Sequence, residues 1–307
     1  MRIVVVGLGV QGYKRRSAAG ASCIATIDPI NAEASYRDIR DVPLADYDAA
    51  LVCTPDGAKL SLLRYLLENG KHVLVEKPLG AEDDAALREL QSIAERKRVL
   101  CYTAYNHRFE PHFARMREVI ASGVLGRIYS VRLFYGNGTA RLVRESVWRD
   151  KGAGVLPDLG SHLLDTVLYW FGANLGLPRM ISARRFENAA YDHVVFALDG
   201  DIHIEMEMTL LSWRNHFSAD IMAEKGSAHI SSLCKWGPAS FTLRDRKLPS
   251  GRPDEETSVL TMPDPTWALE YAEFCRRCSD PAAHGFGNIG NDLWINGHLR
   301  HLTDKVS

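Results

Sequence analysis

The sequence has no long hydrophobic run. A membrane-spanning helix needs roughly 20 predominantly apolar residues, and no stretch of the chain approaches that length. The chain opens with MRIVVVGLG, in which a short apolar run leads directly into glycines. A signal peptide has a longer apolar core and a small-residue cleavage site. We therefore expect a cytoplasmic protein without a membrane partner.

Net charge is almost absent too. The 37 Lys and Arg residues balance 38 Asp and Glu residues, which leaves a formal net charge of -1. Proteins that bind nucleic acid or anionic lipid usually carry a basic excess. We expect no nucleic-acid partner and, by default, a small-molecule partner.

Cysteine is sparse, with six residues in 307. A chain of this length builds its core without a disulfide framework, so we predict reduced, buried thiols. Cys275 and Cys278 have the CxxC spacing on a predicted helix. No second pair accompanies them, and a structural zinc takes about four ligands, so we predict no metal there.

The length favours two domains that share a cleft. In the first part of the chain, short apolar runs alternate with helical patterns. Such runs are typical of strands buried on both faces of a parallel sheet, so residues 1–105 predict a doubly wound α/β domain. The predicted strands are 3–6, 23–27, 49–53, 72–75 and 99–102.

Beyond about residue 105 the pattern changes, because apolar and polar residues alternate as in half-buried antiparallel strands. We predict that residues 106–307 form an α+β domain with a large open, mostly antiparallel sheet. The alternating stretches are 127–136, 192–200, 201–211 and 216–226, and the predicted helices among and after them are 158–172, 265–278 and 292–303.

Three residues of this second sheet suggest an apolar face for another subunit: Met206, Met208 and Trp213. Exposed apolar patches often mark protein interfaces. We expect a homo-oligomer, a dimer or tetramer, formed through the C-terminal sheet.

A glycine loop follows the first predicted strand, with the sequence Gly7-Leu8-Gly9-Val10-Gln11-Gly12. In the GxGxxG pattern the first glycine makes the tight turn, the second lets the backbone approach a pyrophosphate, and the third lets the helix pack on the strand. The helix N-terminus then offers amide donors to phosphate. We predict a dinucleotide bound by this loop; the alternative is a glycine turn that binds no nucleotide.

Asp28 closes the second predicted strand, 21 residues after Gly7. An acid at this position accepts hydrogen bonds from the adenosine ribose and repels a 2'-phosphate. We therefore predict NAD as the cofactor, with NADP disfavoured. Against this preference stand Arg37, or the pair Arg15 and Arg16, which are near enough in sequence to reach a phosphate.

Lys77 ends the predicted strand 72–75, within Glu76-Lys77-Pro78. Ligands of open α/β sheets bind at the carboxyl ends of the strands, so we place Lys77 where a nicotinamide would lie. The alternative is a surface lysine before a proline.

Asp158, His162 and Asp165 follow one another at spacings of four and three, on one face of a helix start. They are compatible with a helix cap and surface charges, or with part of a metal site. No third and fourth metal ligands are evident nearby, so we predict no metal.

Five segments together resemble the Gfo/Idh/MocA family, named for glucose-fructose oxidoreductase and inositol dehydrogenase: GLGVQG, TP before a helix, GKHVLVEKP, YNHRFEP and GVLPDLGSHLLD. The resemblance covers nearly the whole chain. It implies a Rossmann domain followed by an open-sheet domain, and a lysine of EKP that acts with the Asp and His of DxGxH. Those roles fall on Lys77, Asp158 and His162.

The resemblance also implies further site residues, namely Thr54 and Pro55 beside the nicotinamide ribose, Glu76 near the ring, and Asn106 and Arg108 at the domain junction. Trp148 and Arg149 precede the DxGxH helix and are candidate substrate contacts. An anionic substrate group is suggested by Arg141, Arg144 and Arg149, which otherwise form a solvated or ion-paired basic loop.

The chain departs from the family pattern in two places. The stretch between Asp28 and Ala49 contains prolines and no clear helical pattern, so the usual helix is short or missing. The TP motif is followed by Asp56-Gly57-Ala58-Lys59, where many relatives carry Asn and His.

The resemblance implies an NAD(P)-dependent oxidoreductase that moves a hydride between nicotinamide and a hydroxyl or keto carbon of a sugar, cyclitol or nucleotide-sugar, and the residue types agree with that chemistry. His162, with a reference pKa of about 6.5, suits the general acid/base. Lys77 suits stabilisation of a developing alkoxide, and Asp158 orientation of the substrate or histidine. The alternatives are a glycosidase that uses transient oxidation and a non-catalytic NAD(P)-binding regulator.

Overall fold

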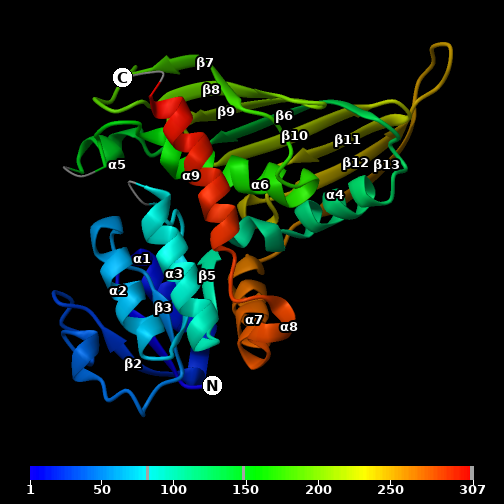
Figure 1. Ribbon diagram of the computed structural model, residues 1–307. Helices are drawn as coiled ribbons and strands as arrows, with labels where there is room; N and C mark the ends of the chain where they lie inside the picture. The colour runs from blue at the N-terminus through cyan, green and yellow to red at the C-terminus, as the bar shows by residue number, and fades with distance from the viewer. Residues whose placement is uncertain (81–82, 147–148, 305–307) are drawn as a thin grey trace. The chain divides into compact units, whose positions relative to one another are not determined.

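The computed structural model describes residues 1–80, 83–146 and 149–304. In it the chain forms two compact units (Figure 1). The first consists of Met1–Asn106 with Pro265–Asn296, and the second of His107–Asp264 with the described residues from Gly297 onward. A segment from the C-terminal part of the chain therefore belongs to the first unit.

The first unit is built on a parallel sheet with the order β2-β1-β3-β4-β5. Every strand of the sheet pairs in parallel with its neighbours, which confirms the predicted doubly wound sheet. The strands are β1 (Ile3–Val6), β2 (Cys23–Ile27), β3 (Ala49–Val52), β4 (His72–Glu76) and β5 (Cys101–Ala104).

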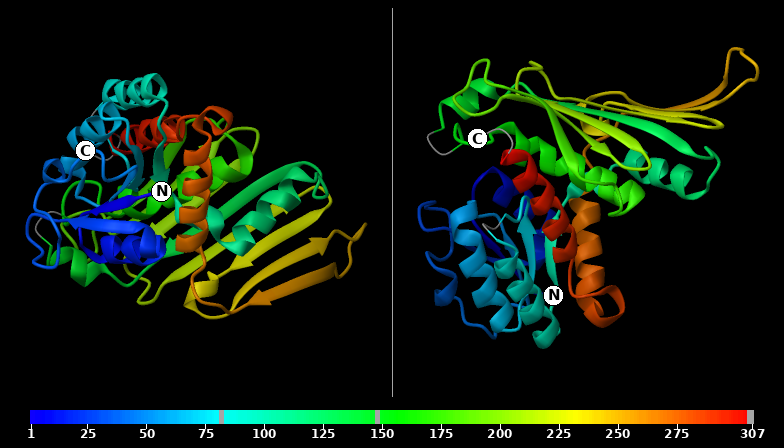
Figure 2. Two further views of the ribbon diagram at one scale, coloured as in Figure 1. Left: turned by 90° about the horizontal axis from the view of Figure 1, so that it is seen from below. Right: turned by 45° about the horizontal axis from the view of Figure 1, so that its top comes forward.

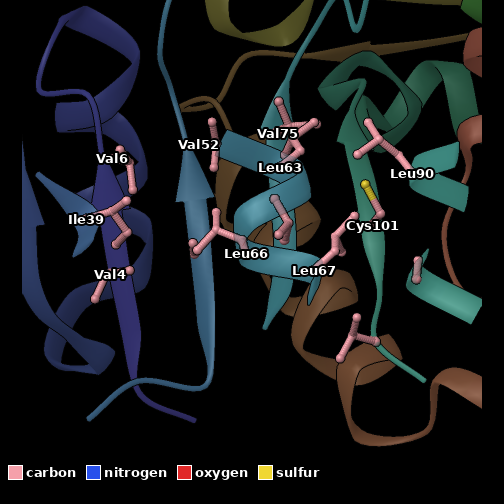
Figure 3. Packing of buried hydrophobic residues seen from close by; sticks show 14 of the residues in the cluster. Val4, Val6, Ile39, Val52, Leu63, Leu66, Leu67, Val75, Leu90 and Cys101 are labelled. Carbon is pink, nitrogen blue, oxygen red and sulfur yellow. The ribbon is translucent and has the colours of Figure 1, made fainter. Parts of the chain in front are cut away.

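Both faces of this sheet are buried. Ile3 and Val5 belong with Phe274 to the core cluster on one face, and Val4 and Leu63 both belong to the cluster on the other face, part of which Figure 3 shows. Successive strand residues point to opposite faces, so a continuous apolar run needs helices on both. Those helices are α1 (Val10–Ala19) and α7 (Thr266–Ser279) on one face, and α2 (Asp56–Glu68) and α3 (Asp84–Lys97) on the other.

No α-helix connects β2 to β3, as the sequence predicted. Only a short 3-10 turn, Ile39–Asp41, occurs in this connection. Tyr36 instead lies alongside the end of β2, where its backbone N–H donates to the carbonyl of Thr26 at 3.1 Å. The residues after Asp28 therefore extend the edge of the sheet instead of covering a face.

Asp48, just before β3, ties that strand to the N-terminus. Its carboxylate accepts hydrogen bonds from the Arg2 backbone N–H and guanidinium, each at 2.7 Å. These bonds lower the pKa of Asp48 to about 2. A carboxyl group whose pKa is lower in the folded state than in the unfolded state stabilises the fold at pH values above its unfolded-state pKa. This stabilisation is lost as the pH falls through the folded-state pKa.

We therefore expect Asp48→Asn to lower the free energy of unfolding at pH 7 and to matter much less near pH 2. Because the Asp48 side chain is 41% exposed, solvent screening limits the effect to about 1 kcal/mol. Urea unfolding at the two pH values measures it, with exposed Asp46→Asn as the control. An equal loss at both pH values would contradict the account.

The second unit is built on an eight-stranded sheet with the order β13-β12-β11-β10-β6-β9-β8-β7. The β6–β9 pair is parallel and the other pairs of described strands are antiparallel, in agreement with the predicted open sheet. Its strands are β6 (Ile128–Gly136), β7 (Pro178–Arg184), β8 (His193–Asp199), β9 (His203–Thr209), β10 (His216–Ala223), β11 (Gly226–Ser231), β12 (Ala239–Asp245) and β13 (Asp254–Leu260).

Helices α4 (Pro111–Ala121) and α6 (Ser161–Phe171) lie along one face of this sheet (Figures 1 and 2). Met206 and Met208 are fully buried within the chain, so the prediction that they present an apolar face to another subunit is wrong. The opposite face carries charged pairs such as Arg132 with Glu205, at 3.2 Å. Trp213, in contrast, is 91% exposed.

The remaining helices include a π-helical turn that precedes α6, where the sequence predicted one continuous helix. The two closing helices form where predicted, and α9 begins in the first unit and ends in the second. These elements are the π turn Leu156–Gly160, α5 (Ala140–Arg144), α8 (Pro281–His284) and α9 (Ile289–Thr303). In the part of the chain that the structure describes, no helix is both long and apolar enough to cross a bilayer.

Candidate active site

Three predicted motifs of the first unit lie at the carboxyl ends of adjacent strands. Gly7 follows β1, Thr54 follows β3 shortly after its last residue, and Glu76 ends β4. β1 lies between β2 and β3, so the chain order reverses there. The crevice beside such a reversal is where open α/β sheets bind ligands.

The glycine loop has two positions that need glycine for the fold and one that does not. Gly7 has a φ of +93°, and a Cβ there would lie 2.7 Å from the Cys53 carbonyl oxygen. At Gly12 a Cβ would lie 1.9 Å from the Gly7 oxygen. At Gly9 it would meet nothing within 4 Å. The exposed Gly9 backbone, at the start of α1, is therefore open to a ligand.

Asp28 is held beside this loop by backbone amides. Its Oδ2 accepts from the Leu8 N–H at 2.8 Å, and its Oδ1 accepts from the N–H groups of Ile30 and Asn31 at 2.9 and 2.8 Å. Burial works to raise the pKa of Asp28, but these amides outweigh it and lower the pKa. A carboxylate has about four acceptor positions, so one remains for a ligand hydroxyl.

Two of the three arginines that would favour NADP have partners in the chain. Arg37 donates to the carbonyl of Asn31 at 2.7 Å. Arg15 is 1% exposed and pairs with Glu76 and Glu270, each at 2.6 Å. Arg16 is exposed on α1.

Thr54 and Pro55 lead from β3 into α2. The Thr54 hydroxyl oxygen is buried and has no hydrogen-bond partner among the described residues. An unsatisfied buried hydroxyl costs free energy unless a ligand or water pairs with it. With the open Gly9 backbone and the Asp28 carboxylate, this orphaned oxygen fits a bound dinucleotide.

In the second unit His162 lies in the first turn of α6 and is 8% exposed. Its ring stacks on that of His107, with centroids 4.2 Å apart and an interplanar angle of 21°. Tyr135 lies edge-on to His162 at 5.8 Å. Burial, and then the charge of Asp158, raise the pKa of Tyr135, so its hydroxyl stays protonated.

Asp158 precedes His162 by four residues and Asp165 follows it by three, and the two carboxylates have different surroundings. Asp158 is half-buried and pairs with Arg149 at 3.3 Å. Asp165 is buried and accepts from Arg108 through both oxygens at 2.6 to 3.1 Å. Burial raises the pKa of Asp165 and the Arg108 guanidinium opposes that rise. Asp165 therefore anchors α6 through Arg108.

The basic loop before α6 is engaged with the chain itself. Arg141 pairs with Glu145 at 2.8 Å, and Arg144 donates to the carbonyl of Glu187 at 3.3 Å.

The predicted site residue Asn106, in the first unit, donates to the Thr266 hydroxyl at 2.8 Å. Trp148 lies outside the described residues. In the described parts of the chain no three His, Cys, Asp or Glu side chains are grouped to hold a metal ion.

Sequence reasoning missed three residues around the candidate site. His107 lies inside the YNHRFEP motif, between Asn106 and Arg108, which the resemblance implies as site residues. Lys59 stands out in the sequence only as a departure from the family pattern. Glu270 had no signal, because a carboxylate on an amphipathic helix resembles any surface acid until its burial is known.

A parallel doubly wound sheet with a glycine loop at the order reversal defines a dinucleotide-binding domain. Residues 1–105 match the family described as "Oxidoreductase family, NAD-binding Rossmann fold", and residues 113–229 match the "GFO/IDH/MocA C-terminal domain". The chain belongs to the GFO/IDH/MocA family of oxidoreductases, and its first unit has the NAD(P)-binding Rossmann fold.

Two curated relatives that the chain matches are both named as dehydrogenases. The chain is 29% identical over 214 residues to trans-1,2-dihydrobenzene-1,2-diol dehydrogenase of Bos taurus, and this match covers 68% of the chain and 62% of that protein. It is 28% identical over 155 residues to scyllo-inositol 2-dehydrogenase (NADP(+)) IolW of Bacillus subtilis (strain 168), and this match covers 50% of the chain and 42% of that protein. The matches therefore span less than two thirds of these relatives.

Solved structures share the fold over almost the whole chain. Levoglucosan dehydrogenase in complex with NADH has a TM-score of 0.81 at 18% identity, covering 100% of this chain and 98% of that one. UDP-N-acetylglucosamine 3-dehydrogenase GnnA from Acidithiobacillus ferrooxidans has a TM-score of 0.80 at 18% identity, and the match covers 98% of this chain and 96% of that one. At these identities the likeness is one of fold.

Proposed function

We propose that the protein is an NAD-dependent dehydrogenase that moves a hydride between nicotinamide and a carbinol carbon of a polyhydroxylated small molecule. The observation that carries the proposal is the fit of a dinucleotide to the first unit. An open Gly9 backbone, the Asp28 carboxylate and an orphaned Thr54 hydroxyl gather at the carboxyl ends of adjacent strands. The family to which the chain belongs supplies the reaction class.

The proposed mechanism gives each side chain a role that suits its chemistry. NAD, when bound, supplies the hydride acceptor. His162 takes the hydroxyl proton of the alcohol, and the His107 ring stacked on it limits its rotation. Lys77 hydrogen-bonds the same oxygen and stabilises alkoxide charge as it develops. Asp158, which pairs with Arg149, orients the substrate.

NAD preference is proposed from Asp28, whose amide bonds keep its carboxylate ionised beside the loop. We expect Asp28→Asn to lower the NADPH dissociation constant relative to the NADH dissociation constant at least about tenfold, because the substitution removes like-charge repulsion of the 2'-phosphate. Fluorescence titration with both cofactors measures this. The control is Glu33→Gln, an exposed acid in the same connection; an unchanged ratio in Asp28→Asn would oppose the assignment.

For the substrate we propose a neutral sugar or cyclitol ahead of a nucleotide-sugar. Arg141 and Arg144 make contacts within the chain, so they are less suited to hold a phosphate. Relatives named for inositol and for a dihydrodiol act on neutral vicinal alcohols by name. We also propose a homo-oligomer formed through the C-terminal sheet.

The test is a panel of cyclitols, sugars, dihydrodiols and nucleotide-sugars with NAD, with reduction followed at 340 nm. Ligands that bind the folded state raise the melting temperature, so a thermal-shift screen selects the panel. NADH formation with a neutral polyol supports the proposal. Cleavage of a nitrophenyl glycoside without net NADH would indicate the glycosidase, and cofactor binding without any turnover would indicate a regulator.

A further inference from the structure

Lys59, on the first turns of α2, binds the backbone of the turn that carries Lys77. Its Nζ donates to the Glu76 carbonyl oxygen at 2.8 Å and to the Pro78 carbonyl oxygen at 2.8 Å. The same nitrogen lies 2.7 Å from Asp56 Oδ1. One ammonium therefore joins the residues on both sides of Lys77.

We propose that Lys59 is a positioning residue for Lys77. The inference rests on the proposed function, in which Lys77 meets the substrate oxygen. It goes further by assigning a role to a residue where the chain departs from the family pattern.

The surroundings of the Lys59 ammonium suit a positioning role and leave it no direct contact with a substrate. A lysine ammonium has three N–H donors and no acceptor. Two backbone carbonyls accept hydrogen bonds from Lys59 Nζ, and the Asp56 carboxylate lies beside the same nitrogen as its ion-pair partner. The Lys59 side chain is only 4% exposed. The Lys59 ammonium is therefore enclosed by groups of the chain itself, and in this proposal it affects the reaction only through the turn that carries Lys77.

A second buried cation fixes the side chain of the same turn. Arg15 Nε donates to Glu76 Oε1 at 2.6 Å, while its Nη2 donates to Glu270 Oε2 at 2.6 Å. Arg15 also stacks over the Trp267 ring at 4.4 Å. Backbone and side chain of the turn are thus each held by one cation, and Lys59 holds the part that sets the direction of Lys77.

The chain contains a matched control at the other end of β4. Lys71 directly precedes that strand, and its Nζ donates to the carbonyl oxygens of Leu44 and Tyr47 at 2.6 and 2.8 Å. It has the same donor group and two backbone acceptors, but it lies at the amino end of the sheet. Lys59→Met and Lys71→Met therefore remove comparable bonds at opposite ends of one strand.

We expect Lys59→Met to lower kcat about 10- to 100-fold, because a small misplacement of a reacting group has effects of that size. Lys71→Met should lower the melting temperature similarly and leave kcat within about twofold, since distant sites act independently. Lys59→Arg, which keeps the cation, should recover part of the rate. The NAD dissociation constant should stay nearly constant throughout.

A double-mutant cycle separates positioning from general damage. In a Lys77→Met background, Lys59→Met should lower the residual rate less than about twofold, because coupled residues are not additive. A full additional loss in that background, or equal rates for Lys59→Met and wild type, would overturn the proposal.

Hydrogen exchange gives a readout that needs no turnover. Lys59→Met should speed exchange in a peptide covering residues 72–80, and Lys71→Met should leave the amides after Glu76 unchanged. Unchanged exchange after Glu76 in Lys59→Met would overturn the positioning role. If exchange rises but the wild-type protein oxidises no alcohol, the placement of the turn stands and the proposed function fails.

Discussion

Replacing His162 with asparagine is expected to lower kcat about 10²- to 10⁴-fold, the usual contribution of general acid-base catalysis. His162 is nearly buried in the second unit, stacked on His107 and edge-on to Tyr135. Asparagine keeps a polar group of similar reach but cannot take a proton near neutral pH. The dinucleotide site belongs to the first unit, so the NAD dissociation constant should be unchanged.

The control for this substitution is another buried histidine of the same unit. His112 is 2% exposed and its Nε2 lies 3.2 Å from the Ala239 carbonyl oxygen. His112→Asn should cost stability and leave kcat of the folded protein nearly unchanged. Steady-state kinetics over pH 5 to 9 compares the two variants. A His162→Asn enzyme with the wild-type rate and pH profile would remove His162 from the mechanism.

Replacing Gly9 with alanine is expected to weaken NAD binding about 100-fold, equal to roughly 2.7 kcal/mol, without unfolding the protein. A Cβ at Gly9 meets no protein atom within 4 Å, so the free protein accommodates it. The added methyl group occupies the space through which the loop backbone approaches a pyrophosphate. Calorimetric titration with NAD and thermal melts measure both effects.

Two other glycines make this result specific. Gly290→Ala, at the start of α9, also meets nothing within 4 Å, and it should leave both NAD affinity and melting temperature nearly unchanged. Gly12→Ala places a Cβ 1.9 Å from the Gly7 oxygen and should destabilise the fold itself. Equal NAD affinity in Gly9→Ala and wild type would mean that the dinucleotide lies elsewhere.

The sequence was informative wherever burial alone decides the structure. The run Ile3–Val6 is apolar at every position because helices cover both faces of its sheet, and the sequence alone shows this pattern. The strands β12 and β13 were not predicted: β13 is mostly polar, and β12 is a short strand in which only Ala239 and Phe241 are fully buried. Cross-strand pairs hold them, such as Thr242 with Thr257 at 2.9 Å and Arg244 with Glu255 at 3.1 Å, and such pairs appear only once register is known.

In the candidate site, too, some residues could be predicted from the sequence and others only from the structure. Glycine spacing and the EKP and DxGxH motifs selected Gly9, Lys77 and His162 because the chemistry itself restricts those residue types. Lys59 and the stacked His107 emerged only from the structure, since their roles depend on where a nitrogen or a ring points. The return of α7 to the first unit was equally hidden, because an amphipathic helix does not say which sheet it covers.

The most direct test of hydride transfer uses a polyol deuterated at the carbinol carbon, with NAD, followed by mass spectrometry of the cofactor. We predict NADH that carries one deuterium on the nicotinamide ring, formed by the wild-type protein and nearly abolished in Lys77→Met. Turnover that leaves the cofactor without deuterium, or no reduction of NAD by any alcohol that binds, would contradict the account.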